Sequence, residues 1–134
     1  MLSISSPRFL RHVLRVDAVS CLACGVLQFA FTGQMATLLN LPHDLLLYTG
    51  EFLLLYGLAV GVLSALRDMP RGLVWCLVAA NLAWAVACVV LLLSGQVQAS
   101  AMGVAYVLVQ ALTVAVLAEL QFFGLRRAPV EVAW

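Results

Sequence analysis

The stretch that decides the fold is Leu73-Val-Trp-Cys-Leu-Val-Ala-Ala-Asn-Leu-Ala-Trp-Ala-Val-Ala-Cys-Val-Val-Leu-Leu-Leu93, which contains no charged residue. A transmembrane α-helix needs about 20 consecutive apolar residues, because each residue advances about 1.5 Å through a hydrocarbon layer of about 30 Å. The stretch meets this requirement and is too long and too uniformly apolar for a strand of a membrane β-barrel. It therefore predicts a helix that crosses a lipid bilayer.

Three further apolar stretches of comparable length predict three more crossings. We expect an all-α membrane protein, an up-down-up-down bundle of four transmembrane helices that forms a single domain over residues 1–134. The predicted spans cover residues 16–32, 45–66, 73–93 and 99–124. The link over residues 33–44 is longer than the others, and its leucines before Pro42 predict a short helix at the membrane interface.

The composition supports the bilayer as the main partner of this chain. Hydrophobic residues make up 65% of it and charged residues only 10%. A water-soluble domain commonly carries about 25–35% charged residues on its surface. The net charge of +1 gives no reason to expect a nucleic-acid partner.

The basic residues predict the orientation of the bundle. All seven are arginines, and four crossings place every one of them on the same side of the membrane. Cytoplasmic loops are enriched in Lys and Arg, so we expect both termini in the cytoplasm. The first span is not read as a cleaved signal, because charged residues occupy the position of its hydrophobic core. The arginines are Arg8, Arg11 and Arg15 before the first span, Arg67 and Arg71 in the second link, and Arg126 and Arg127 after the fourth span.

Three acidic residues fall within the predicted spans, where ionisable groups are costly and often functional. Asp17 lies near the cytoplasmic arginines, which predicts an interfacial ion pair with Arg15 or a neighbour. Glu119 is expected to extend toward the arginines that follow the fourth span. Glu51 has no basic residue predicted on its side of the membrane. It is either a neutral group that hydrogen-bonds across the bundle or a carboxyl that binds a proton or substrate.

Other polar residues fall on single helical faces. If these faces meet, polar groups extend through the bundle. They either hold the helices together, at about 0.6–2 kcal/mol for each contact, or form a binding path that includes Glu51, Gln28, Asn81 and Gln110. The faces consist of Asp17, Cys21, Cys24 and Gln28 in the first span, Asn81, Trp84 and Cys88 in the third, and Tyr106, Gln110 and Thr113 in the fourth, with Gln121 close to the same line.

Small residues on one face of the second span predict close packing of another helix, in the same chain or in a partner. They are Gly50, Gly57, Gly61 and Ser64. Removing side chains lets two helix backbones approach closely. This face and the alanine-rich third span predict a homo-oligomer or a larger membrane complex.

Motifs for chemistry are weak. Cys21 and Cys24 have the spacing of a redox pair but no basic partner to activate a thiol, and His12 and His43 are predicted on opposite sides of the membrane. Neither paired carboxylates nor a phosphate loop is present. We therefore expect no catalytic residue, no metal site and no cofactor, and hence a protein that is not an enzyme.

The segment Asn81-Leu-Ala-Trp84 and the segment Ala118-Glu-Leu-Gln-Phe-Phe-Gly-Leu-Arg-Arg127 resemble a group of small, uncharacterised four-span bacterial inner-membrane proteins. The resemblance extends from about residue 15 to residue 127. It implies a multi-pass protein of the bacterial inner membrane and implies no activity.

Two functions follow as hypotheses. The first is an accessory or assembly subunit that acts through helix packing with itself or with a partner. The second is a small proton-linked transporter or channel that uses an intramembrane carboxylate, with Glu51 as the first residue to test.

Overall fold

The computed structural model describes residues 7–127, and this part of the chain forms five α-helices. Four of them are long and apolar enough to cross a membrane, as the sequence predicts. The short helix predicted between the first two spans is also present. The helices are α1 (Pro7–Ala30), α2 (Thr32–Leu39), α3 (His43–Ala65), α4 (Arg71–Leu93) and α5 (Ala101–Arg127).

Helix α1 begins nine residues before the predicted start of the first span. Hydropathy detects only the apolar part of a helix, whereas the backbone hydrogen bonds continue through the turns that carry Arg8, Arg11 and Arg15. The other long helices match their predicted spans to within three residues at each end.

Helices α1 and α3 pack tightly because glycines line their contact. A β-carbon built on Gly57 would lie 2.9 Å from Cγ of Leu22, and one built on Gly50 would lie 3.0 Å from Cβ of Gln28. From the side of α1, a β-carbon on Gly25 would lie 3.0 Å from the carbonyl oxygen of Gly50. The glycine face of α3 is therefore occupied by α1 of the same chain.

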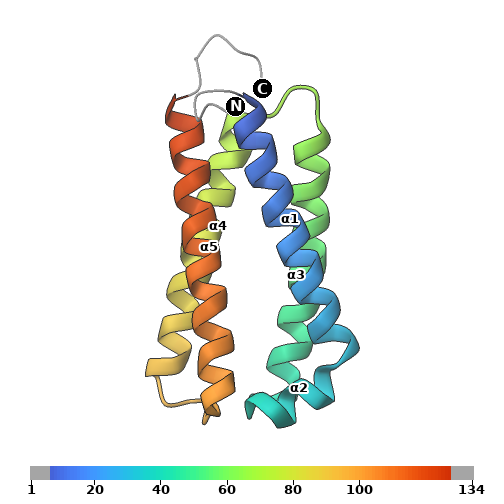
Figure 1. Ribbon diagram of the computed structural model, residues 1–134, viewed down its shortest axis with the longest axis vertical. Coiled ribbons are helices and arrows are strands. Elements are labelled where there is room, and N and C mark those ends of the chain that lie inside the picture. Colours follow the sequence, from blue (N-terminus) through green and yellow to red (C-terminus); the bar gives the residue numbers. More distant parts are fainter. Residues whose placement is uncertain (1–6, 128–134) are drawn as a thin grey trace.

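Helices α4 and α5 form the second closely packed pair, and α1 contacts α5 across the bundle (Figure 1). Along their described lengths, the backbones of α3 and α4 do not approach each other closely. Their contact is made by side chains. The rings of Phe52 and Trp84 stack with centroids 5.5 Å apart, and the hydroxyl of Tyr56 donates to Oδ1 of Asn81.

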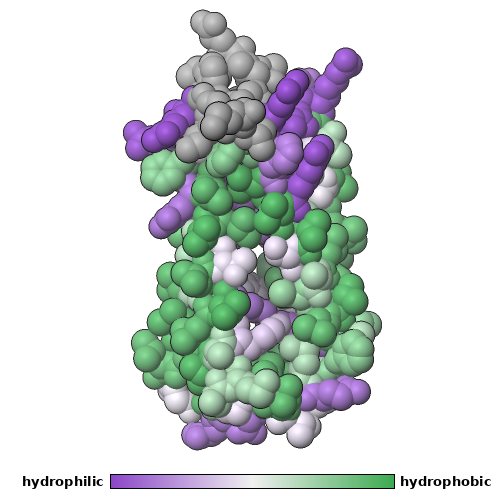
Figure 2. Space-filling view, in the orientation of Figure 1, coloured by the Kyte–Doolittle hydropathy of each residue, from purple (hydrophilic) through white to green (hydrophobic). Residues whose placement is uncertain are grey.

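The start of α1 and the end of α5 lie at one end of the bundle, which we call the terminal end, and α2 lies at the other, the α2 end (Figure 1). On the face shown in Figure 2, hydrophobic residues cover most of the length of the bundle, and hydrophilic residues gather toward its two ends. At the terminal end, Arg11 donates to the carbonyl oxygens of Ser64 and Arg67, and Arg71 donates to that of Leu125. Ser64 and Leu125 lie in the last turns of α3 and α5, so these arginines bind carbonyls that helices leave unpaired at their carboxyl ends.

The carboxyl end of α2 binds the segment that leads into α5. The backbone nitrogen of Ser100 donates to the carbonyl oxygen of Leu39 at 2.9 Å, and its hydroxyl donates to that of Leu38 at 2.9 Å. A β-carbon at Gly103 would lie 2.2 Å from the Leu39 oxygen, so the close approach requires glycine. This contact joins the α1/α3 pair to the α4/α5 pair at the α2 end.

The glycine packing predicts a position-dependent effect of alanine. Gly57→Ala should destabilise the bundle by about 1–3 kcal/mol, because the new methyl group meets Leu22. Gly72→Ala is the matched control, since nothing lies within 4 Å of the new β-carbon. The measurement is unfolding in mixed micelles with increasing SDS. Equal stability of the two variants would contradict this account of the α1–α3 contact.

Candidate functional site

A buried carboxylate lies at the contact between the two helix pairs. Asp17 on α1 has no exposed surface. Its Oδ2 accepts hydrogen bonds from Nδ2 of Asn81 on α4 at 3.0 Å and from Nε2 of Gln121 on α5 at 2.7 Å. The thiol of Cys21, one turn along α1, lies 3.5 Å from Oδ1. The carboxyl group thus links α1 to both helices of the other pair.

The amides around Asp17 are oriented by further hydrogen bonds. Nδ2 of Asn81 also lies 3.3 Å from Oε1 of Gln121, and Oδ1 of Asn81 accepts the hydroxyl of Tyr56 at 3.2 Å. With Tyr56 as a donor on α3, all four long helices contribute to one network. Every contact of the Asp17 oxygens comes from a donor, which is the arrangement a carboxylate needs.

The predicted ion pair of Asp17 with Arg15 is wrong. Among residues 7–127, no arginine forms an ion pair with Asp17, and the Arg15 side chain is exposed. The helical phase of α1 turns Asp17 toward α4 and α5, and there the amides of Asn81 and Gln121 take the place of a basic partner. Helical phase, not depth along the helix, decides what Asp17 contacts.

A second polar cluster lies nearer the α2 end. Nε2 of Gln28 lies 2.5 Å from the hydroxyl oxygen of Tyr106, and Nε2 of Gln110 lies 2.9 Å from the same oxygen. Oγ1 of Thr49 on α3 is 2.9 Å from Oε1 of Gln28. Gln28 is buried, whereas the other three side chains are half-buried. This cluster joins α1 and α3 to α5.

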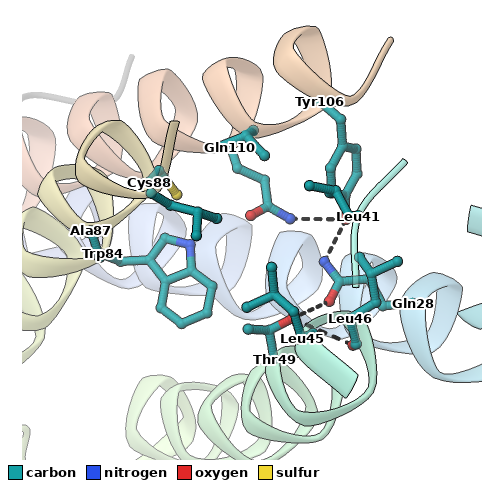
Figure 3. A pocket seen from close by; sticks show the side chains of 12 residues that line it. Gln28, Leu41, Leu45, Leu46, Thr49, Trp84, Ala87, Cys88, Tyr106 and Gln110 are labelled. Carbon is teal, nitrogen blue, oxygen red and sulfur yellow. Dashed lines mark hydrogen bonds between the residues drawn. The ribbon is translucent and has the colours of Figure 1, made fainter. Parts of the chain in front are cut away.

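Three cavities lie between the helix pairs in the described part of the chain, and the smallest has a volume of only about 50 Å³. The first, of about 220 Å³, lies nearer the α2 end, between the second polar cluster and α4, and we call it the α2-side cavity (Figure 3). The second, the central cavity, has a volume of about 110 Å³ and extends toward Asp17 and Leu117. Trp84, Tyr106 and Gln110 line both, so the two cavities meet at these side chains.

Apolar side chains close the bundle beyond each cavity. At the terminal end, Leu10, Leu14, Met69 and other residues form a buried cluster beyond Asp17. At the α2 end, Leu39 of α2 and Leu41 belong to a second buried cluster. Passage along the bundle axis is therefore blocked on both sides by packed hydrocarbon.

The openings face sideways. Ala87 and Leu45 line the α2-side cavity from α4 and α3, and Ala87 is exposed, so this cavity opens between the separated helices α3 and α4. Val109 and Thr113 on α5 line the central cavity and are exposed, which places its opening between α1 and α5. Figure 2 shows this second side of the bundle, with a hollow about halfway along it.

The two other acidic residues of the spans do not join the network. The side chains of Glu51 on α3 and Glu119 on α5 are exposed. Of the two alternatives for Glu51, a hydrogen bond across the bundle is therefore wrong. Its exposure also separates it from Gln28, Asn81 and Gln110. The face of α3 that turns inward carries Thr49 and Tyr56 instead.

The remaining predictions about polar faces agree well with burial. Asp17, Cys21, Gln28, Asn81, Cys88 and Gln121 are buried. Thr113 is exposed and only borders the central cavity. All four cysteines are free thiols, and the described residues contain no group of three metal-ligating side chains. Tyr56 and Thr49 were not predicted, although their seven-residue spacing on α3 is the signal that would have identified them.

In comparisons with protein-family models, curated proteins and solved structures, nothing matches this chain.

The hydrogen bonds of Asp17 predict which substitutions the bundle tolerates. Asp17→Leu should lower the free energy of unfolding by about 2–4 kcal/mol, because it leaves the amides of Asn81 and Gln121 without their acceptor. Asp17→Asn should cost less than about 1 kcal/mol, since one amide oxygen still accepts both donors and its nitrogen faces only the Cys21 thiol.

SDS-induced unfolding of the two variants and the wild type measures this difference. An Asp17→Asn protein as unstable as Asp17→Leu would mean that the negative charge, not the hydrogen-bond acceptor, holds the helix pairs together.

Proposed function

We propose that the protein is a non-enzymatic, multi-pass membrane protein that binds a small lipid-soluble molecule between its two helix pairs. The observation that carries the proposal is a pair of adjacent cavities closed along the bundle axis and open at the sides. A molecule dissolved in the bilayer reaches such openings directly, whereas a water-soluble molecule has to cross packed hydrocarbon.

The cavity walls support the same class of ligand. Nearly all of the surface that lines them is apolar, and the polar groups of the second cluster are mostly paired with one another. Pockets for small molecules are commonly lined by apolar and aromatic side chains with a few polar groups that set the orientation. Trp84, Tyr106 and Gln110 provide that combination at the junction of the two cavities.

We further propose that the four long helices cross the membrane in alternating directions, with both termini in the cytoplasm of a bacterial cell. The arginines support this orientation, because the described ones all lie at the terminal end, where carbonyls at the carboxyl ends of α3 and α5 and in the link after α3 accept hydrogen bonds from Arg11 and Arg71. The bacterial inner membrane remains a proposal based on the sequence resemblance.

An accessory or assembly role has less support than the sequence suggested. The glycine face of α3, which favoured a partner helix, packs against α1. The exposed alanines of α4 remain available to a second copy or to another membrane protein. A complex of this kind is compatible with ligand binding, because it would leave the opening between α1 and α5 free.

A bulky side chain at the opening should reduce binding. Ala87→Phe places a ring at the opening of the α2-side cavity, and Ala79→Phe adds the same ring to an exposed position of α4 that lines no cavity. We expect saturable binding of radiolabelled 2,3-dimethylnaphthalene to the wild type and to Ala79→Phe in nanodiscs. Its affinity for Ala87→Phe should be at least about tenfold lower, a loss of about 1.4 kcal/mol.

Probe counted in protein-free nanodiscs is subtracted, and thermal melting checks that both variants are folded. If the wild type binds no more probe than Ala87→Phe does, the proposed function is wrong.

Proton-linked transport is a second candidate, favoured by the complete burial of Asp17 at the inner end of the central cavity. Ionisable residues within a membrane often serve as proton relays. The carboxyl group that serves this function would be Asp17, since Glu51 is exposed to the outside of the bundle.

This candidate predicts loss of flux without loss of fold. In liposomes with an imposed pH gradient, the wild type should dissipate the gradient when the transported molecule is present, and Asp17→Asn should not. Glu51→Gln is the matched control and should transport normally. Unchanged flux in folded Asp17→Asn would exclude a role for Asp17 in proton coupling.

A further inference from the structure

No hydrogen bond in the two networks described above involves the indole N–H of Trp84. Its ring lines the α2-side and central cavities and also a smaller one beside Tyr56 and Asn81. Among residues 7–127, no acceptor pairs with its N–H group. The tryptophan N–H is a donor only, so only an acceptor atom can pair with it.

The position of Trp84 makes an unpaired donor costly. Along α4 it lies about 20 Å from Arg71 and about 14 Å from Leu93, at about 1.5 Å per residue. The bilayer offers no water at this depth, and the ester carbonyls of phospholipids lie near its surface. A molecule that enters the cavity can supply this acceptor.

The surroundings of the indole fix its orientation. Phe52 of α3 stacks on it with ring centroids 5.5 Å apart and an angle of 6° between the planes. Figure 3 shows the ring at the edge of the cavity, with Gln110 and Tyr106 on the α5 side. A donor held in this way selects among ligands by where they carry an acceptor.

The lining also limits the charge of the ligand. Among the residues the structure describes, Asp17 is the only one with a carboxyl group that borders either cavity. Its side chain is fully buried, and its oxygens already accept hydrogen bonds. No described lysine, arginine or histidine lines either cavity. A charged ligand would therefore lose its hydration without gaining an ionic partner.

We propose that the cavities bind a neutral, lipid-soluble molecule with a flat ring that carries a carbonyl oxygen, and that the indole N–H of Trp84 donates a hydrogen bond to this oxygen. The ring lies beside the aromatic side chains at the junction, and the apolar remainder of the molecule leaves through a side opening. This inference rests on the proposed function, because it names the ligand class of the same cavities.

A pair of probes that differ only in the acceptor tests the inference. They are 2,3-dimethyl-1,4-naphthoquinone and the hydrocarbon 2,3-dimethylnaphthalene. Methyl groups at both ring positions prevent addition of the cavity thiols Cys21, Cys24 and Cys88. Radiolabelled probes are measured in nanodiscs with and without protein, so that dissolution in the phospholipid is subtracted.

We expect the wild type to bind the quinone about fivefold to tenfold more tightly than the hydrocarbon, as one additional hydrogen bond in a dry site provides. Trp84→Phe keeps a ring against Phe52 and removes the donor. In this variant the preference should fall to about one, with little change in the affinity for the hydrocarbon.

A fluorescence measurement keeps the test decisive if Trp84→Phe does not fold. The protein with Trp75→Phe and Trp134→Phe retains only Trp84, and the protein with Trp84→Phe and Trp134→Phe retains only Trp75, which is exposed on α4. Quenching by the quinone should saturate for Trp84. For Trp75, or for Trp84 combined with Ala87→Phe, it should rise only in proportion to the quinone dissolved in the bilayer.

The outcomes separate the two proposals. Equal affinity for the quinone and the hydrocarbon in the wild type would overturn carbonyl recognition and leave the proposed function intact. If neither probe binds saturably and the quenching of Trp84 does not saturate, both the proposed function and carbonyl recognition would be overturned. Phospholipid chains would then fill the cavities.

Discussion

The hydrogen bonds from the amides of Asn81 and Gln121 to Asp17 join the two helix pairs inside the bundle, at a carboxyl group with no exposed surface. Within each pair, small residues or long apolar contacts bring the backbones close, whereas α3 and α4 meet only through side chains. A bilayer supplies no hydrophobic force between helices, so polar contacts and close packing have to provide the association. The Asp17 network provides this association at one level of the bundle, and the hydrogen bond from Tyr56 to Asn81 extends the network to α3.

The positions of the hydrogen-bonded contacts between the two helix pairs explain where the cavities lie. The pairs are linked at Asp17, at Tyr106, and at the α2 end by Ser100 with the carbonyls of α2. Cavities remain between these levels, where the backbones of α3 and α4 do not approach each other closely. The Trp84 indole lines both cavities, and its N–H donor has no acceptor among the described residues.

The sequence predicted the four long helices well because their existence depends on average hydropathy over about 20 residues, which tolerates local detail. It also predicted most buried polar residues of α1 and α4, since a polar group at a regular helical spacing in an apolar span has to face inward. The error with Glu51 has the opposite origin. The depth of Glu51 in its span says how far it lies from the arginines, but not which side of α3 it occupies. The glycines of α3 indicate one packed face and do not place Glu51 relative to it.

Partners of buried polar groups could not be predicted at all, because they depend on how two helices are rotated against each other. Asp17 is the clearest case. Arg11 and Arg15 precede it closely in the sequence, yet its hydrogen-bond donors Asn81 and Gln121 are 64 and 104 positions away. The guanidinium of Arg11 binds no acid in the described part of the chain but donates to the carbonyl of Ser64 near the end of α3 and to the carbonyl of Arg67 in the link that follows.

Backbone carbonyls near helix ends therefore compete with acidic side chains for arginines, and at the terminal end of this bundle such carbonyls bind Arg11 and Arg71. That competition leaves a carboxyl group inside the membrane with amides as its only described partners besides a thiol. Asp17 keeps its donors only while Asn81 on α4 and Gln121 on α5 stay opposite it. A ligand that shifts α4 and α5 against α1 therefore also changes the surroundings of Asp17.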